Sequence, residues 1–373
     1  MTRVRPTYAE IDLDAIRHNV EVLADRAGDA DVCAVVKADG YGHGAVPVAR
    51  AALEAGATWL AVALVEEGEE LRQAGLDAPI LLLSEPPNEA ADRILAAGIT
   101  PAVYTLGFLA AMDAAARDRD TRAEIHLKAD TGMGRVGAPE EDWDGLLATA
   151  TDADHVDVTG LWTHLARADE PDVSTTERQL DRFDRFLDRA RGAGIEPDFV
   201  HAANSAATLA HPRAHHDLVR VGIAMYGLSP APQLPAADFD LRPAMRFVTE
   251  VAYAKRITAG TAVSYGHTWE APADGWLATL PVGYADGVPR LVSNRVDVLV
   301  RGARRPVAGN VCMDQVMVWC GDQKIEIGDE VVLLGGQDGA RITADEWAEA
   351  AETITYEIAT SITARVPRTY LGA

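Results

Sequence analysis

From about residue 30 to residue 225, short apolar runs alternate with amphipathic segments along the chain. Apolar runs of four to eight residues bounded by turn residues are typical of buried strands, and the segments between them have helical spacing. The runs occupy residues 32–37, 59–64, 79–84, 100–105, 123–128, 158–165, 198–204 and 217–223. Eight such units predict a (β/α)8 TIM-type barrel, an α/β fold, with an open doubly wound sheet as the alternative.

The clearest helical segment is "STTERQLDRFDRFLDRARGAG". Ser174 and Glu177 have the spacing of a capping box, and apolar residues then recur at helical spacing from Leu180 onward. We therefore expect a helix that begins with this capping box and ends at Gly192 or Gly194.

After about residue 240 the pattern changes to strand-like runs separated by Gly, Pro, Asn and Asp, with little helical spacing. This predicts a barrel domain over residues 1–240 and a C-terminal mainly-β domain over residues 241–373. The opening stretch "RPTYAEIDL" is itself strand-like, so we expect residues 1–12 to form a strand that joins the β domain. Residues 343–362 are predicted to be helical.

Composition narrows the function. The 373 residues carry a formal net charge of −23, which argues against nucleic acid or a membrane surface as a partner. Cys33, Cys312 and Cys320 lack the spacing of metal ligands, so neither a metal site nor a disulfide framework is expected. No signal-like or membrane-spanning apolar run is present, which makes the cytoplasm the expected location.

Polar side chains gather where the predicted strands end. The first strand runs into "VVKADGYGHG", and only four of the 34 basic residues are lysines, so Lys37 stands out. A lysine that extends to solvent is the ordinary alternative. Lys128, His164, Asn204 and Arg220 lie at or near the ends of other strands. Because barrel strands present functional groups at their C-terminal ends, we expect a functional cleft there.

Two stretches near the last strands suit a phosphate. "RVGIAMYG" offers backbone N–H groups at Gly222 and Ile223, and "ANSAAT" offers the Ser205 hydroxyl at a helix start. A strand-end lysine beside a phosphate cradle suggests pyridoxal 5′-phosphate held as a Schiff base.

Along essentially its whole length the chain resembles the alanine racemase family. The matching stretches are "AVVKADGYGHG", "LKADTGMGRVG", "THLARADE", "HAANSAATL", "LVRVGIAMYGL", "SYGHTW", "LPVGYADG", "VCMDQ" and "TITYEI". The resemblance implies a homodimeric, pyridoxal-phosphate-dependent isomerase that interconverts L-alanine and D-alanine and supplies D-alanine for peptidoglycan.

The resemblance also implies roles for individual residues. It makes Lys37 the Schiff-base lysine and one catalytic base, and Tyr265 of the partner subunit the second base. His164 and Arg220 become candidates for a cationic environment around Tyr265. The implied cofactor contacts are Lys37, Tyr41, Arg135, His164, Asn204, Ser205, Arg220, Gly222, Ile223 and Tyr356. The implied substrate contacts are Arg135, Met313 and Asp314, and the implied modification is carbamylation of Lys128, whose negative charge would hold Arg135.

Three alternatives remain. An amino-acid decarboxylase of the same fold type places a cysteine where Cys312 lies, but pairs an acidic residue with the pyridine nitrogen where this chain has Arg220. A single-barrel pyridoxal-phosphate-binding protein would lack the β domain. A broad-specificity racemase for small amino acids would share every motif, and Asn310, where the family often has arginine, leaves substrate breadth open.

Overall fold

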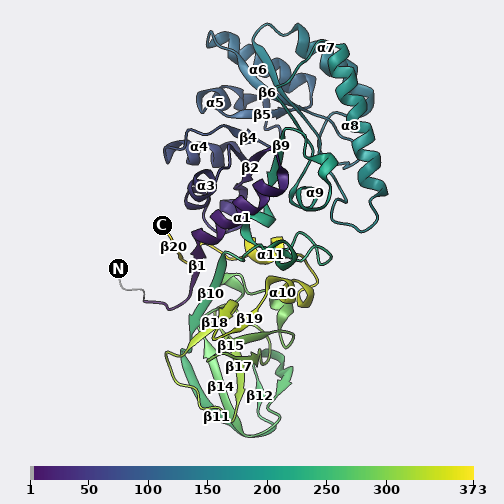
Figure 1. Cartoon of the computed structure of the whole chain (residues 1–373). Helices are drawn as coiled ribbons and strands as arrows, with labels where there is room; N and C mark the ends of the chain where they lie inside the picture. Colours follow the sequence, from purple (N-terminus) through teal and green to yellow (C-terminus); the bar gives the residue numbers. More distant parts are fainter. Residues whose placement is uncertain (1–3) are drawn as a thin grey trace. The chain divides into compact units, whose positions relative to one another are not determined.

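The computed structural model describes residues 4–373 and divides into two compact units (Figure 1). The barrel unit comprises Ile16–Gly40 and Ala45–Arg242. The β unit comprises the N-terminal residues up to Ala15, the short stretch Tyr41–Gly44, and Pro243–Ala373. Of the expected N-terminal strand over residues 1–12, residues 1–3 lie outside the described residues.

The barrel unit contains an eight-stranded sheet in the order β8-β7-β6-β5-β4-β3-β2-β9, in which every pairing is parallel. The strands are β2 (Asp31–Val35), β3 (Trp59–Val62), β4 (Ile80–Leu82), β5 (Thr100–Val103), β6 (Ala123–Lys128), β7 (Val156–Trp162), β8 (Phe199–His201) and β9 (Leu218–Val221). Backbone bonds from Asp217 N to Val200 O and from Arg220 N to Ala203 O, both 3.0 Å, join the two outermost strands. The predicted barrel is confirmed, and the open sheet is wrong.

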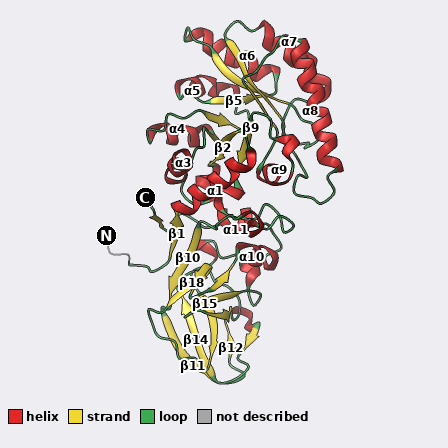
Figure 2. Ribbon diagram, viewed as in Figure 1, coloured by secondary structure: helices red, strands yellow, loops and turns green. Residues whose placement is uncertain are grey.

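Helices surround these strands, as Figure 2 shows for the barrel unit. The main ones are α1 (Leu13–Ala27), α3 (Ala45–Glu54), α4 (Val65–Gln73), α5 (Ala91–Ala96), α6 (Leu106–Asp118), α7 (Trp143–Asp152), α8 (Ser174–Gly192) and α9 (Ser205–Ala210). Apolar side chains of both strands and helices are buried, as expected for the core between barrel and helix layer.

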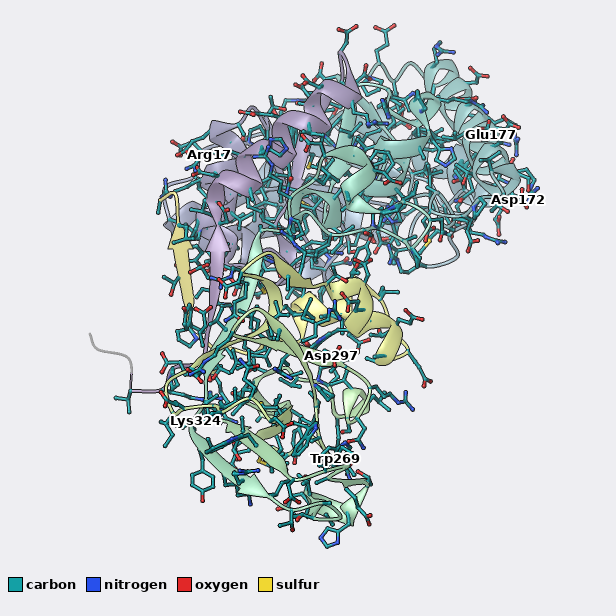
Figure 3. All side chains as sticks on the ribbon, turned by 60° about the horizontal axis from the view of Figure 1, so that its bottom comes forward. Arg17, Asp172, Glu177, Trp269, Asp297 and Lys324 are labelled. Carbon is teal, nitrogen blue, oxygen red and sulfur yellow. The ribbon has the colours of Figure 1, made fainter. Side chains whose placement is uncertain are left out.

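Helix α8 ends at Gly192, one of the two predicted positions, but the predicted capping box at its start is wrong. Ser174 is already inside the helix, and its backbone N–H donates to Asp172 Oδ1 at 3.0 Å. The Glu177 carboxylate instead pairs with the Arg213 guanidinium at 2.5 Å (Figure 3 labels Asp172 and Glu177). The Glu177 N–H, which a Ser174 cap would have accepted, donates to Val173 O at 2.9 Å, so neither bond of the capping box forms.

The β unit is built on a seven-stranded sheet with the path β16-β15-β18-β10-β1-β20, to which β19 adds through β18. Its strands are β1 (Tyr8–Asp12), β10 (Met245–Glu250), β15 (Asp297–Val300), β16 (Ala303–Pro306), β18 (Glu330–Gln337), β19 (Ala340–Ile342) and β20 (Arg368–Leu371). A second sheet joins β11 (Tyr253–Ile257), β14 (Gly275–Leu280) and β17 (Val316–Gly321), and β12 (Ala262–Val263) pairs with β13 (Trp269–Glu270). Strand β1 pairs with β10 and β20.

The late segment predicted to be helical forms two short helices, α10 (Ala344–Ala350) and α11 (Thr355–Thr360). A capping box starts α10, in which the Thr343 hydroxyl and the Glu346 carboxylate accept each other's backbone N–H. Residues 351–354 separate the helices: Glu352 has a left-handed backbone with φ of 56°, and Ile354 is extended.

Candidate active site

Lys37 follows strand β2 and opens a turn with unusual backbone geometry. Ala38, Asp39 and Gly40 have φ of 53°, 52° and 57°, and Tyr41 has φ of 51°, so four consecutive residues are left-handed. Only glycine adopts this region without steric cost; other residues lose about 1–2 kcal/mol each. Strained backbone of this kind is concentrated at functional sites, where the surrounding structure holds it in place.

The surroundings of Lys37 favour its uncharged amine. Burial lowers its pKa below the usual lysine value, and the nearby Arg135 guanidinium lowers the pKa further. The Glu67 carboxylate acts in the opposite direction and raises the pKa. Because burial is the largest of the three influences, Lys37 releases its proton more readily than a surface lysine.

Two further cations, Lys128 and Arg220, are almost fully buried, with exposed fractions of 2% and 3%. Burial lowers the pKa of Lys128 to about 7, and Arg220, Arg135 and Lys37 all act in the same direction. The Trp162 ring accepts cation–π contacts from both, at 4.0 Å from Lys128 Nζ and 4.6 Å from Arg220 Cζ. The barrel unit therefore contains a cluster of basic side chains, although the chain as a whole is strongly acidic.

Arg220 is held by neutral partners. Its guanidinium donates to Thr163 O at 2.9 Å, to Ala202 O at 3.1 Å and to His201 Nδ1 at 2.7 Å. Within residues 4–373, no carboxylate pairs with it. A buried charge without an opposite charge is costly, so a lone pair or anion beside Arg220 would stabilise the site.

Two histidines that sequence reasoning missed extend this network. A guanidinium can only donate, so His201 Nδ1 must accept, and His201 Nε2 carries the hydrogen that faces His126 Nδ1 at 3.0 Å. Burial lowers the pKa of His126 to about 3 and that of His201 well below its ordinary value, so both rings are neutral. Their sequence signal was a histidine inside two otherwise apolar strands, "AEIHLK" and "DFVHAAN".

His164 lies beyond the end of β7, and its Nδ1 is 3.4 Å from Arg220 Nη2. Burial lowers the pKa of His164 well below the ordinary histidine value, and Arg220, Lys128, Arg135 and Lys37 lower it further. The ring is therefore neutral near pH 7. Burial and the neighbouring basic groups therefore argue against His164 as a source of positive charge and leave Arg220 as the candidate.

Ser205 and Asn204 lie at the start of α9. The Ser205 hydroxyl oxygen accepts the backbone N–H groups of Gly222 at 2.9 Å and Ala224 at 3.3 Å, flanking Ile223. Its own hydrogen remains a donor. Asn204 caps α9 by accepting from Ala207 N at 3.0 Å and donates to Leu165 O at 3.3 Å, so its amide orders two loops.

In the β unit, the Tyr41 and Tyr356 rings lie 6.1 Å apart between centroids. Burial raises the pKa of Tyr41 to about 12, so its phenol stays protonated and keeps its hydrogen as a donor. Arg368 Nε donates to Gly42 O at 2.9 Å and fixes the backbone just after Tyr41.

Tyr265 lies in a short 3-10 helix (Tyr265–His267) and is 73% exposed. Left-handed residues flank it, Ser264 with φ of 66° and Gly266 with φ of 74°, and Asn310 Nδ2 donates to Tyr265 O at 2.6 Å. It lines a pocket of about 570 Å³ together with Cys312. Asn310, which departs from the family pattern, thus fixes the backbone of Tyr265.

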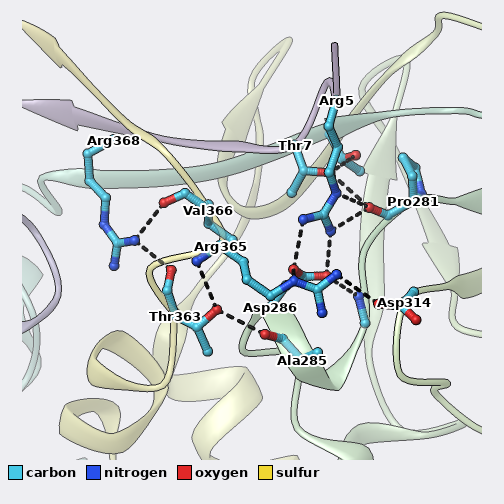
Figure 4. A network of polar contacts seen from close by, with 12 residues as sticks. Arg5, Thr7, Pro281, Ala285, Asp286, Asp314, Thr363, Arg365, Val366 and Arg368 are labelled. Carbon is cyan, nitrogen blue, oxygen red and sulfur yellow. Dashed lines mark hydrogen bonds and ion pairs between the residues drawn. The ribbon is translucent and has the colours of Figure 1, made fainter. Parts of the chain in front are cut away.

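Met313 and Asp314 form a bend closed by the bond from Cys312 N to Gln315 O at 3.0 Å, and Figure 4 shows Asp314 beside Arg365. Met313 is 53% exposed, and its carbonyl accepts from Ala285 N at 3.0 Å. Asp286, which is fully buried, accepts from Arg5 at 2.8 Å, and Arg365 links it to Asp314 through contacts of 3.5 and 2.8 Å. Sequence reasoning missed Arg5, Asp286 and Arg365, because their partners lie far away along the chain.

Within residues 4–373, no helix has the length and apolar character needed to cross a membrane, and no group of three or more His, Cys, Asp or Glu side chains is arranged to hold a metal ion. Cys33, Cys312 and Cys320 are free thiols.

Comparison with known families decides the assignment. The family model described as "Alanine racemase, N-terminal domain" matches residues 11–230, and "Alanine racemase, C-terminal domain" matches residues 244–370. The chain belongs to the alanine racemase family. The resemblance seen in the sequence motifs is confirmed, and the chain is an isomerase of this family.

Individual alanine racemases match over nearly their whole length. The protein from Frankia casuarinae is 49% identical over 97% of this chain and 96% of its own length. The solved alanine racemase from D-cycloserine-producing Streptomyces lavendulae is 47% identical, with a TM-score of 0.97, and covers 100% of this chain and 98% of its own. The Bacillus anthracis alanine racemase, solved with bound L-Ala-P, is 39% identical with a TM-score of 0.93. The match covers 100% of this chain and 96% of the Bacillus anthracis chain.

Proposed function

We propose that this chain interconverts L-alanine and D-alanine in the cytoplasm with pyridoxal 5′-phosphate as cofactor, and that the D-alanine enters peptidoglycan. A cluster of basic side chains, of which Lys128 and Arg220 are almost fully buried, carries the proposal. Lys128 and Arg220 both contact the Trp162 ring, Lys37 and Arg135 act with them to lower the pKa of His164, and no carboxylate among residues 4–373 pairs with Arg220. Such a cluster fits a cofactor that bears a phosphate, a phenolate and a ring nitrogen with a lone pair.

The residues present fit this group. When bound, pyridoxal phosphate makes the α-hydrogen of a linked amino acid acidic by spreading the negative charge left behind. We assign the link to Lys37 and the pyridine nitrogen to Arg220, whose guanidinium can only donate. The phosphate would be held by Tyr41, Ser205, Gly222, Ile223 and Tyr356, with Asn204 and His164 completing the pocket.

Racemisation needs a proton removed from one face of a carbon and returned to the other, which one fixed base cannot do easily. We assign Lys37 to one face, because its lowered pKa leaves more of the amine uncharged and able to accept a proton. We assign Tyr265 to the other face. Its phenol is exposed in the single chain, which supports a homodimer in which Tyr265 acts at the partner's Lys37.

Arg135 would contact the cofactor phenolate and the substrate carboxylate, since a guanidinium pairs well with carboxylates. We propose that Lys128 is carbamylated: its neutral amine nitrogen bonds to the carbon of CO2 and releases one proton, giving a carbamate anion. The pKa of about 7 supports this, because the uncharged amine is the reactive form. The resulting negative charge would attract Arg135, which an ammonium repels.

Met313 and Asp314 are the proposed substrate-pocket residues from the partner subunit. Their fixed backbone, held by Ala285 and by Arg365, suits a pocket of defined size. A broad-specificity racemase for small amino acids remains the second candidate, favoured by Asn310 in place of a bulkier cation near Tyr265.

A stereospecific assay tests the function. Purified protein incubated with pyridoxal phosphate and L-alanine should form D-alanine, detected by a D-amino-acid oxidase coupled reaction. The reverse reaction should have the same kcat/KM, because the equilibrium constant between enantiomers is one. A panel of L-serine and other small L-amino acids would measure breadth. Formation of CO2 and an amine without D-alanine would contradict the proposal and favour a decarboxylase.

A further inference from the structure

Glu67 makes contacts that none of the assigned roles explains. It lies in the first turn of α4, and its Oε2 accepts the backbone N–H groups of Ala63 at 2.8 Å and Leu64 at 3.1 Å. Its other oxygen, Oε1, accepts the backbone N–H of Ala38 at 2.6 Å. One carboxylate therefore caps a helix and also holds the residue that directly follows Lys37.

The contact lies where the backbone most needs support. Ala38 is the first of the left-handed residues, and both Ala38 and Asp39 carry side chains that disfavour this conformation. Farther along the turn, Gly40 N donates to Val36 O at 2.8 Å and Ala45 N donates to Asp39 Oδ1 at 2.9 Å. The bond to Glu67 therefore holds Ala38, the first left-handed residue. Ala38 directly follows Lys37, so its backbone sets the direction of the Lys37 side chain.

We propose that Glu67 is a positioning residue for the racemase reaction, which clamps the left-handed turn at Ala38 and thereby fixes the direction in which Lys37 leaves the strand. This rests on the proposed function of Lys37, and it adds a residue from a different βα unit to the machinery. A charge-assisted bond to a backbone N–H is a strong one, so its loss should release the turn.

The carboxylate has a second, separable influence on Lys37. Of the charged groups that act on the Lys37 amine, Arg135 lowers its pKa and Glu67 raises it, while burial lowers it most. Lys128 and His164 also lie within electrostatic range. Removing the carboxylate should thus shift the Lys37 titration to lower pH, whereas shortening the side chain should loosen the turn and keep most of the charge.

Two variants separate these influences, with a control from the same helix. Glu67→Gln removes the charge and leaves one acceptor oxygen for three N–H groups. Glu67→Asp keeps the charge but shortens the reach to Ala38. Glu70→Gln changes an exposed glutamate in the same helix. Hydrogen exchange of residues 37–44 in the full-length cofactor-free chain reports the turn, and the pH dependence of cofactor attachment to Lys37 reports the amine.

We expect exchange in residues 37–44 to rise about tenfold in Glu67→Gln and Glu67→Asp and to stay unchanged in Glu70→Gln, as loss of one charge-assisted bond implies. Cofactor release should accelerate by a similar factor in both. The pH midpoint of attachment should fall only in Glu67→Gln. Unchanged exchange in both Glu67 variants would overturn the clamp. Because exchange is measured without cofactor, this result is independent of whether the parent chain racemises alanine.

Discussion

The barrel unit and the β unit hold their proposed active-site residues in opposite ways. Lys128 and Arg220 in the barrel unit are almost completely buried and contact the Trp162 ring and backbone carbonyls. In the β unit, Tyr265 is 73% exposed and Met313 is 53% exposed. A single chain thus builds the cation cluster by itself, but leaves the second proposed base in solvent.

The difference has a physical reason. Buried cations keep unusual pKa values because they are removed from water, so the barrel can tune Lys37 and Lys128 without a partner. For an exposed tyrosine and methionine, burial of their apolar atoms under another surface is favourable in free energy. The comparison therefore predicts that variants in the barrel unit act within each chain, while variants in the β unit act across a dimer.

The largest effect is expected for Lys37→Ala. Loss of both the cofactor link and a proton acceptor should reduce racemase activity on the order of 10⁴-fold. Borohydride treatment of the parent followed by peptide mapping should place the reduced cofactor on Lys37. The control is Lys324→Ala, since Lys324 (labelled in Figure 3) is a surface lysine and its amine pairs with Glu326 at 2.8 Å; this variant should keep full activity. A cofactor label on Lys255 or Lys324 would contradict the assignment.

Tyr265→Phe tests the exposed side of the comparison. It removes only the phenolic oxygen and should lower activity on the order of 10³-fold. Unfolding and refolding a mixture with Lys37→Ala should then restore about a quarter of parental activity, because half the dimers are mixed and one of their two sites is intact.

The mixing experiment has a direct counter-result. If both bases came from the same chain, no combination of the two variants would rebuild a site. A mixture that contains heterodimers by mass spectrometry, yet shows only the summed residual activities, would show that Tyr265 serves its own chain.

A smaller effect is expected for Arg220→Glu. Replacing a donor with a carboxylate should let the pyridine nitrogen keep a proton, which strengthens electron withdrawal and favours side reactions. Racemisation should fall on the order of 10²-fold while pyruvate formation by transamination rises relative to it. Chiral analysis of alanine and a coupled pyruvate assay measure both rates. If the ratio of transamination to racemisation were the same as in the parent, Arg220 would have no electronic role.

The smallest effect concerns Lys128 and carbon dioxide. Its pKa of about 7 means that the uncharged amine becomes abundant as pH rises through that value, so carbamate formation should increase from pH 6 to pH 8. In ¹³C-bicarbonate buffer the parent should show a carbamate ¹³C signal that Lys128→Met lacks, and removal of CO2 should lower activity about tenfold through the loss of one charge-assisted contact. Identical spectra for parent and variant would exclude the modification.

Much of the fold was readable from pattern. Each of the eight predicted apolar runs forms a barrel strand, because a strand buried on both faces needs a continuous apolar run and the turns between need polar residues. The α8 capping box failed because the helix begins one residue earlier than the spacing suggests, so that Asp172 accepts the Ser174 N–H and the Glu177 N–H donates to Val173 O. The late helical segment was split at a left-handed Glu352, a backbone conformation that its composition does not reveal.

The motifs by themselves determined the family and the identity of the candidate residues, including Lys37, Arg220 and Tyr265. Only the tertiary structure decided that Arg220 rests on His201 and His126, that Glu67 bonds to Ala38, and that His164 is neutral. Residue type and spacing specify which groups a chain possesses and which elements they follow. Burial, protonation and hydrogen-bond partners depend on which distant segments pack around a group. Those segments come together only when the barrel folds.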